Sequence, residues 1–240
     1  MKSRSLALVL ATAATLAVTS LHGTSRADGA APTPSTAPAA PAPMCTAPAE
    51  SVVTAVQNFY NATTTFSSDF TQSYKVKAYN QTKTSAGHVI FSKPGKMDWT
   101  YKDPAGNRIV SDGTLLRVYE AANKQMYEQA VNQSQYPAAL AFLTGQGQLS
   151  KLFNFKMCTG AEMQFPGGSV LVGTPITPTP AYEKVLFYVD SATSQVRRVL
   201  ILDGQGNTNR FDFQAPVVNQ PVPPTQFVFT PPPGTTIVKP

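Results

Sequence analysis

Apolar residues recur along this chain first with the period of a helix and then with the period of a strand. In APAESVVTAVQNFY, Val52, Val56 and Phe59 stand at positions i, i+4 and i+7, which is one apolar face of an amphipathic helix. Pro48 suits the first turn of such a helix, and Glu50 suits the positive end of its dipole. We therefore expect a helix that begins near Pro48.

After this helix the apolar period becomes two, which is typical of half-buried strands. In FTQSYKVKA, Phe70, Tyr74, Val76 and Ala78 alternate with Thr, Ser and Lys residues. Asp-Gly in SDG (111–113) predicts a tight turn, because glycine tolerates positive φ. Similar patterns predict further strands over 88–92, 97–101, 109–111, 115–119, 124–129, 154–158, 169–174, 182–190, 196–202 and 208–213, and a last one at QFVFTPPPG.

The alternation stops over residues 136–153, where YPAALAFLTG and QLSKLF predict two short helices. Leu140 and Leu143 share one face of the first, and Gly145 is placed to end it. Strands dominate, and the connections between them are short. The pattern therefore predicts a mainly β fold, a strongly curved or barrel-like antiparallel sheet with a few helices over one face.

The first 47 residues differ from the rest. Lys2 and Arg4 precede the apolar run LALVLATAATLAV, and small residues surround Ala27. This run is too short for a membrane span of ~20 apolar residues and is typical of a cleaved signal peptide, residues 1–27. Residues 28–47 are rich in Ala and Pro without a periodic apolar face, which predicts a disordered tether. Residues 48–240 then form one domain.

Charge and cysteine content refine this organisation. The formal charge of +6 falls to +3 once Lys2, Arg4 and Arg26 leave with the signal peptide, which is too mild to indicate nucleic-acid binding. Cys45 and Cys158 remain, and two cysteines of an exported chain usually form a disulfide in an oxidising compartment. A lipid anchor on Cys45 is disfavoured, because APAPM precedes it far downstream of the apolar run.

Few residues are suited to catalysis or to metal binding. His22 leaves with the signal peptide, so a Ser-His-Asp site would have to use His88, and no nucleophile elbow stands near it. A metal site needs three or four ligands, which one histidine and two paired cysteines do not supply. The aspartates are mostly placed at turns or strand ends. We therefore expect neither an enzyme nor a cofactor or metal.

Large apolar side chains are the more informative feature. Many share one parity on their strands: Phe70, Tyr74, Met97, Trp99, Tyr101, Leu186, Tyr188, Phe211, Phe213, Phe227 and Phe229. Two interpretations remain open. These residues either form a packed sandwich core, or they line a concave sheet for a lipid, with the short helices as its cover.

Several motifs then follow one another in a specific order. FSSDFTQSY precedes a strand that contains Lys-Pro-Gly and Trp99, and VSDGTLLRVYEAANKQMYEQ, PAALAFLTGQGQLSKLF and VLFYVDSATSQVRRVLILDGQGNTNRFDF come next. A final FVFTPPPGTTI contains the pattern F-x-F-x-P-P-x-G. From about Val52 to Val238 this order resembles the outer-membrane lipoprotein carrier family, the LolA-type periplasmic chaperones.

The resemblance implies an unclosed antiparallel β-barrel whose concave apolar face is covered by a helical lid. It also implies a monomer in the periplasm that takes acylated lipoproteins from an inner-membrane ABC transporter to an outer-membrane receptor. The residues that would bind the cargo are Phe70, Tyr74, Phe91, Met97, Trp99 and Tyr101, with Leu140 and Leu143 from the lid. An alternative is a lipoprotein-sensing or regulatory domain of related fold.

Lys93 departs from the family pattern, which usually has Arg before this Pro. Pro94 lacks an N–H and fixes φ, which bends the strand and presents Lys93 at the edge of the groove. Its ammonium would then bond carbonyl groups at the ends of the lid helices, around residues 144–148. Because an ammonium is a point donor and a guanidinium a planar fork, we expect Lys93 and Pro94 to form a less specific lid latch.

Overall fold

The computed structural model describes residues 45–131 and 147–239. Residues Met44–Pro240 belong to one compact unit. The expected signal peptide, most of the expected tether and the first expected lid helix, with Leu140 and Leu143, lie outside the described residues. Among the described residues, no helix has the length and apolar character needed to cross a membrane.

The expected N-terminal helix is present as α1 (Glu50–Ala62). It begins two residues after Pro48, and Glu50 stands in its first turn as expected. Its buried stripe consists of Val53, Val56 and Tyr60 rather than Val52, Val56 and Phe59. The helix is therefore rotated by about one residue relative to the prediction, because the sheet beneath it, and not the helix pattern alone, selects the face that is buried.

Twelve strands form a single sheet. Their bounds are β1 Thr65–Val76, β2 Gln81–Ser92, β3 Lys96–Asp103, β4 Arg108–Asp112, β5 Leu115–Glu120, β6 Gln125–Ala130, β7 Phe153–Thr159, β8 Gly168–Pro175, β9 Lys184–Asp190, β10 Val196–Leu202, β11 Thr208–Val218 and β12 Thr236–Val238. The short helices are η1 (Lys77–Tyr79), α2 (Leu149–Leu152) and η4 (Pro224–Phe227). The expected strands at residues 70–129 and 154–213 are all found.

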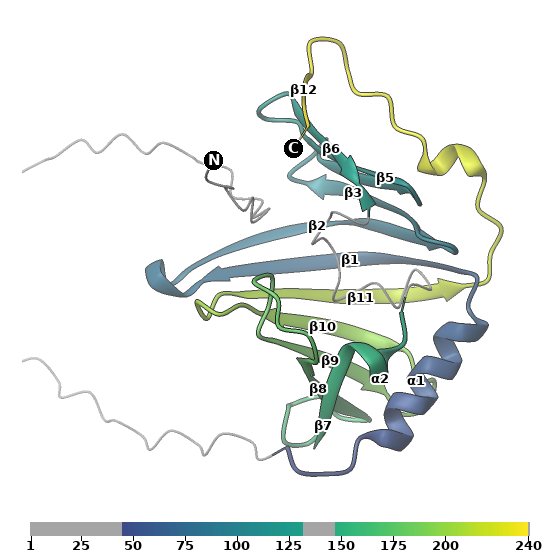
Figure 1. Ribbon diagram of the computed structural model, residues 1–240, viewed down its shortest axis with the longest axis vertical. Coiled ribbons are helices and arrows are strands. Elements are labelled where there is room, and N and C mark those ends of the chain that lie inside the picture. Colours follow the sequence, from purple (N-terminus) through teal and green to yellow (C-terminus); the bar gives the residue numbers. More distant parts are fainter. Residues whose placement is uncertain (1–44, 132–146, 240) are drawn as a thin grey trace, which may run out of the picture. The chain divides into compact units, whose positions relative to one another are not determined.

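The sheet consists of two meanders joined by the pairing of β1 with β11 (Figure 1). β12 and β7 form its two edges and do not pair with each other, so the sheet is unclosed, as the resemblance implies. All strand pairs are antiparallel except β12 with β6. The expected strand at QFVFTPPPG is wrong: its first two residues end η4 and the rest joins no strand, which fits three consecutive prolines that cannot donate to a strand ladder.

The two faces of this sheet differ. We call inner the face that carries Phe70, Trp99 and Phe211, and outer the opposite face. The helices α1 and α2 cross the inner face over the β7–β11 half (Figure 1). The Tyr60 hydroxyl of α1 accepts a hydrogen bond from the backbone N–H of Val196 at 3.2 Å, and burial raises the pKa of this hydroxyl far above its usual range.

The outer face carries two smaller apolar clusters. Four residues that the sequence pattern grouped with the inner aromatics belong to them: Leu186, Tyr188, Phe227 and Phe229. Strand parity alone could not show this, because Phe227 lies in η4, Phe229 lies outside the strands, and the face that Leu186 and Tyr188 take depends on the register between strands. The first cluster packs around Cys158, and in the second Phe227 of η4 and Phe229 lie against β3, β4 and β5.

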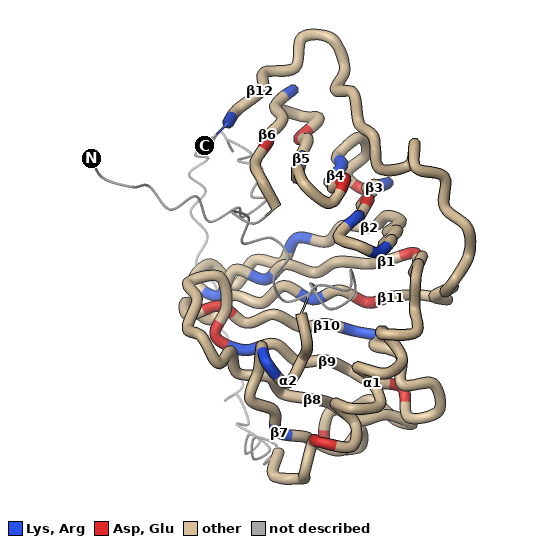
Figure 2. Tube along the Cα trace, turned by 45° about the vertical axis from the view of Figure 1, so that its right-hand side comes forward, with Lys and Arg blue, Asp and Glu red and all other residues tan. Residues whose placement is uncertain are grey.

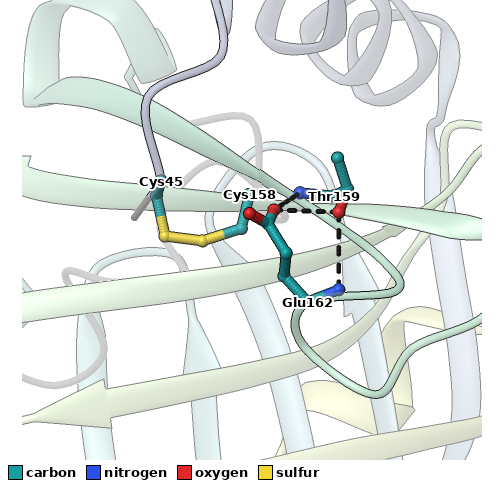
Figure 3. Close-up of a disulfide and its surroundings, with 4 residues drawn as sticks. All are labelled: Cys45, Cys158, Thr159 and Glu162. Atoms are coloured by element: carbon teal, nitrogen blue, oxygen red, sulfur yellow. Dashed lines mark hydrogen bonds between the residues drawn. A yellow bond between two sulfur atoms is a disulfide. The ribbon is translucent and has the colours of Figure 1, made fainter. Parts of the chain in front are cut away.

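A disulfide joins Cys45 to Cys158 of β7, as the sequence predicts (Figure 3). Next to it, Ala47 forms an antiparallel bridge with Met157, so the chain passes along the β7 edge before α1 begins. Cys158 is fully buried in the first outer cluster. The adjoining turn is closed by Glu162, whose carboxylate accepts hydrogen bonds from the N–H and hydroxyl of Thr159 at 2.7 and 2.8 Å. The disulfide therefore fixes where α1 enters the inner face.

Removing this disulfide with Cys45→Ala and Cys158→Ala is expected to lower the free energy of unfolding by about 2–4 kcal/mol, since the bond closes a long loop. The two cysteines are 113 residues apart in the sequence. Guanidinium unfolding of wild type and double variant, each with and without dithiothreitol, measures this. Dithiothreitol should lower the guanidinium midpoint of the wild type and leave that of the double variant unchanged. Equal midpoints for oxidised wild type and double variant would contradict the expectation.

Candidate functional site

Aromatic rings cluster at the centre of the inner face. The Trp99 ring centroid lies 4.8 Å from that of Phe70, 5.2 Å from Phe211 and 5.7 Å from Phe91. Edge-to-face contacts of this kind add to the stabilisation that burial provides. The strands that supply these rings come from both meanders, so the cluster spans the junction between them.

Strand register explains how these rings meet. Phe91 of β2 stands opposite Met97 of β3 and Phe66 of β1. Phe70 stands opposite Gly87, where a Cβ atom would lie 2.9 Å from the Phe70 ring and 2.2 Å from the Thr100 carbonyl oxygen. Gly87 thus leaves the space in which the Phe70 ring reaches Trp99.

Those residues expected to bind cargo that the structure describes do come together, but as a packed layer. Phe70, Phe91, Met97, Trp99 and Tyr101 are at most 5% exposed, and Trp99 is 0% exposed. Tyr74 lies on the same face toward the β1–β2 turn and is only half-buried. An apolar ligand therefore reaches this layer only after a covering element moves.

The sequence analysis missed Phe66, which contacts Phe91 and Phe213 at centroid distances of 5.9 and 5.6 Å. The available signal was its position four residues before Phe70 in TTTFSSDF, because residues four apart on a strand lie on the same face. The Trp99 Nε1–H has no hydrogen-bond partner among the described residues, although it is buried. Such an unsatisfied donor is unusual in a core.

The inner face becomes polar toward the β1–β2 turn. The Tyr101 hydroxyl donates to Gln72 Oε1 at 3.0 Å, and Gln72 Nε2 donates to Asn209 Oδ1 at 2.9 Å. These three side chains give the aromatic layer a polar border at that end. The arrangement suits a ligand with an apolar body and a polar group.

Lys93 lies at the other end of β2. Its ammonium donates to the carbonyl oxygens of Tyr60 and, at 3.4 Å, of Asn61 in the last turn of α1. Partial burial lowers the pKa of Lys93. The expected bonds to residues 144–148 fall partly outside the described residues, and the bonds that the structure shows go to α1. Lys93 thus ties the β2–β3 turn to a helix that covers the inner face.

An arrangement that the sequence did not reveal lies on the outer face. His88 Nε2 is 2.9 Å from Ser67 Oγ, and His88 Nδ1 is 2.9 Å from Asp69 Oδ1. The hydrogen bond with His88, and then Lys102, hold the pKa of Asp69 below its usual range. The spacing matches a Ser-His-Asp triad. However, the Asp69 side chain is 57% exposed on an open strand face, so we derive no reaction from this network.

Metal binding has no support in the part of the chain that the structure describes, where no group of three or more His, Cys, Asp or Glu side chains is placed to hold an ion. The inner face offers aromatic rings and a few neutral polar groups. Its chemistry is that of an apolar layer with a polar border.

Comparison with known proteins agrees with this geometry. The family described as "Outer membrane lipoprotein carrier protein LolA" matches residues 61–230. An outer-membrane lipoprotein carrier protein of Nitrosospira multiformis is 27% identical over 185 residues, which is 76% of this chain and 86% of that protein. One of Cupriavidus pinatubonensis is 28% identical over 188 residues, 77% of this chain and 85% of its own length.

Among solved structures, the LolA superfamily protein of Nitrosomonas europaea covers 76% of this chain and 98% of its own, at 12% identity and a TM-score of 0.44. The family match covers well over half of the sequence and includes β1 to η4. This chain belongs to the LolA family of outer membrane lipoprotein carrier proteins.

Proposed function

We propose that this protein is a periplasmic carrier that binds the acyl chains of lipoproteins on its inner face and moves them from the inner to the outer membrane. The observation that carries the proposal is the continuous aromatic layer on the inner face of an unclosed sheet, in a chain of this family. Each methylene that leaves water for such a surface contributes about 0.8 kcal/mol. An inner-membrane ABC transporter would load the carrier, and an outer-membrane receptor would accept the cargo.

Binding would require an element that covers the inner face to move, because the aromatic layer is closed in the structure; α1, which lies over the β7–β11 half of that face, is the candidate among the described helices. Lys93 opposes this movement through its bonds to the end of α1. A hydrogen bond from a charged donor contributes about 1.5–3 kcal/mol, an amount that burial of a few methylenes exceeds. Cargo can therefore open the carrier, and closure of the same contact helps to expel the cargo at the acceptor.

A direct test is titration with a triacylated lipopeptide, followed through the emission of Trp99, the single tryptophan of the chain. We expect saturable binding, and no binding of the same peptide without its acyl chains. Transfer to acceptor membranes then separates the carrier from the regulatory alternative, since a sensor binds but does not deliver. Absence of saturable, acyl-dependent binding would refute the proposal.

Lys93→Leu is expected to bind lipopeptide more tightly and to release it more slowly, by about 10- to 100-fold, because the closed state loses its bonds to α1. Lys93→Arg should keep the carrier closed more firmly than wild type does, since a guanidinium reaches two carbonyl oxygens. The measurement is the rate of lipopeptide transfer to acceptor vesicles. Lys102→Leu is the matched control, because this exposed lysine lies on the outer face and does not contact α1. A wild-type transfer rate for Lys93→Leu would exclude the latch.

A further inference from the structure

The end of the β1–β2 hairpin projects beyond the rest of the sheet (Figure 1). The two strands stay paired as far as Val76 and Gln81. On one side, β3 pairs with β2 only as far as Ala86. On the other side, β11 pairs with β1 only as far as Lys75. Residues 76–85 therefore form a projection, which we call the hairpin tip.

The hairpin tip carries an exposed aromatic ring. Every residue from Lys77 to Thr84 is exposed, and Tyr79 is 76% exposed. No other large hydrophobic residue in the described part of the chain is as exposed; the next is Val228, at 64%. The Tyr79 ring is therefore left mostly uncovered by the described part of the chain.

The tip is held in one conformation despite its exposure. Residues Lys77–Tyr79 form the turn η1, and Asn80 takes the left-handed conformation with φ 48°. The backbone N–H of Lys77 donates to Asn207 Oδ1 at 3.0 Å, and the Lys77 side chain lies over Gly206. The neighbouring β10–β11 turn thus supports the tip, which presents Tyr79 as a fixed feature of the fold.

The charged side chains of the hairpin itself are all basic. Lys77 and Lys83 of the tip and Lys75 next to it are exposed, and the sequence contains no Asp or Glu from Phe70 to Met97. Figure 2 shows the Lys and Arg positions along β1 and β2. The neighbouring carboxylate, Asp203, accepts hydrogen bonds from the backbone N–H groups of Gln205 and Asn207 and from the Asn207 amide, so its charge is partly engaged within its own turn.

We propose that the hairpin tip docks this protein on an anionic phospholipid surface, with Tyr79 in the headgroup region and the three lysines over lipid phosphates. Tyrosine prefers the membrane–water interface, where its ring is in an apolar layer and its hydroxyl in a wet one. Each lysine close to an anionic surface strengthens binding about fivefold. The contact is weak and reversible, and it does not depend on the proposed cargo.

The test is flotation of the chain without residues 1–27 on vesicles of phosphatidylglycerol and phosphatidylcholine in equal parts, with no lipopeptide present. All described structure lies in residues Met44–Pro240, so the fold is retained. We expect binding that weakens as salt rises through the physiological range, and weaker binding to pure phosphatidylcholine. Absence of binding to the anionic vesicles at low salt would overturn the proposal, whatever the outcome of lipopeptide binding.

Variants locate the contact. Changing Lys75, Lys77 and Lys83 together to Gln should weaken binding to anionic vesicles about 100-fold. Tyr79→Ser should weaken binding to anionic vesicles severalfold. The binding that remains should then come from charge alone and disappear at high salt. The matched controls are Val228→Ser and Lys124→Gln, which alter an exposed apolar side chain and an exposed lysine away from the tip. Circular dichroism checks that each variant is folded. Binding by the triple variant at the wild-type level would show that the tip is not the docking element.

Discussion

Trp99→Glu is expected to unfold the domain. The Trp99 side chain is 0% exposed and surrounded by the rings of Phe70, Phe91 and Phe211. Truncation of such a side chain costs about 3–5 kcal/mol, and burial of a carboxylate adds several more. The sum is comparable with the whole stability of an ordinary domain, about 5–15 kcal/mol. Loss of the near-ultraviolet circular dichroism and of cooperative thermal unfolding would show it.

Trp99→Phe is the control for that experiment. It keeps an aromatic ring in the layer and removes the Nε1–H, which has no partner among the described residues, so part of the cost of the lost volume is offset. We expect it to fold and to lose less than about 2 kcal/mol. A folded Trp99→Glu variant with wild-type cooperativity would mean that the inner face is an open cavity wall, which the packed arrangement does not predict.

The second large effect concerns the ion pair that holds the C-terminal segment on the outer face. Arg108 donates to both carboxylate oxygens of Asp98 at 3.0 and 2.7 Å. Arg108 also donates to the Gln226 carbonyl at 3.0 Å, and the Gln226 amide donates to Asp98. The Asp98 side chain is 1% exposed. Asp98→Ala should therefore lower the free energy of unfolding by about 3–5 kcal/mol, because it leaves Arg108 without its counter-charge.

Chemical denaturation measures this loss, and hydrogen exchange of the β12 amides shows whether the segment after η4 detaches first. The matched control is the double variant Asp98→Leu and Arg108→Met, which replaces the pair with apolar side chains and should recover most of the stability. If the free energy of unfolding of Asp98→Ala lies within about 1 kcal/mol of the wild-type value, the ion pair does not hold the segment.

Local sequence patterns predicted most of the secondary structure. Alternation in FTQSYKVKA and the Asp-Gly turn at 112–113 depend only on neighbouring residues, and both are found, although β1 ends at Val76 and η1 begins at Lys77. Asp112 accepts hydrogen bonds from the N–H groups of Thr114 and Leu115 in that turn. Asp98, by contrast, lies within β3, and its partners come from β4 and from residue 226. Sequence neighbours cannot show a partner 128 positions away.

The sequence by itself determined the mainly β class, the helix at the start of the domain, the pairing of Cys45 with Cys158 and the aromatic residues of β2 and β3 that lie on the inner face. These follow from periodicity, turn chemistry and composition, which act over a few residues or on the chain as a whole. Only the tertiary structure decided that Lys93 bonds the end of α1, that Phe227 and Phe229 lie on the outer face, and that His88 stands between Ser67 and Asp69. Each of these depends on strand register and on which face a distant segment covers, because a shift of one residue moves a strand side chain to the opposite face.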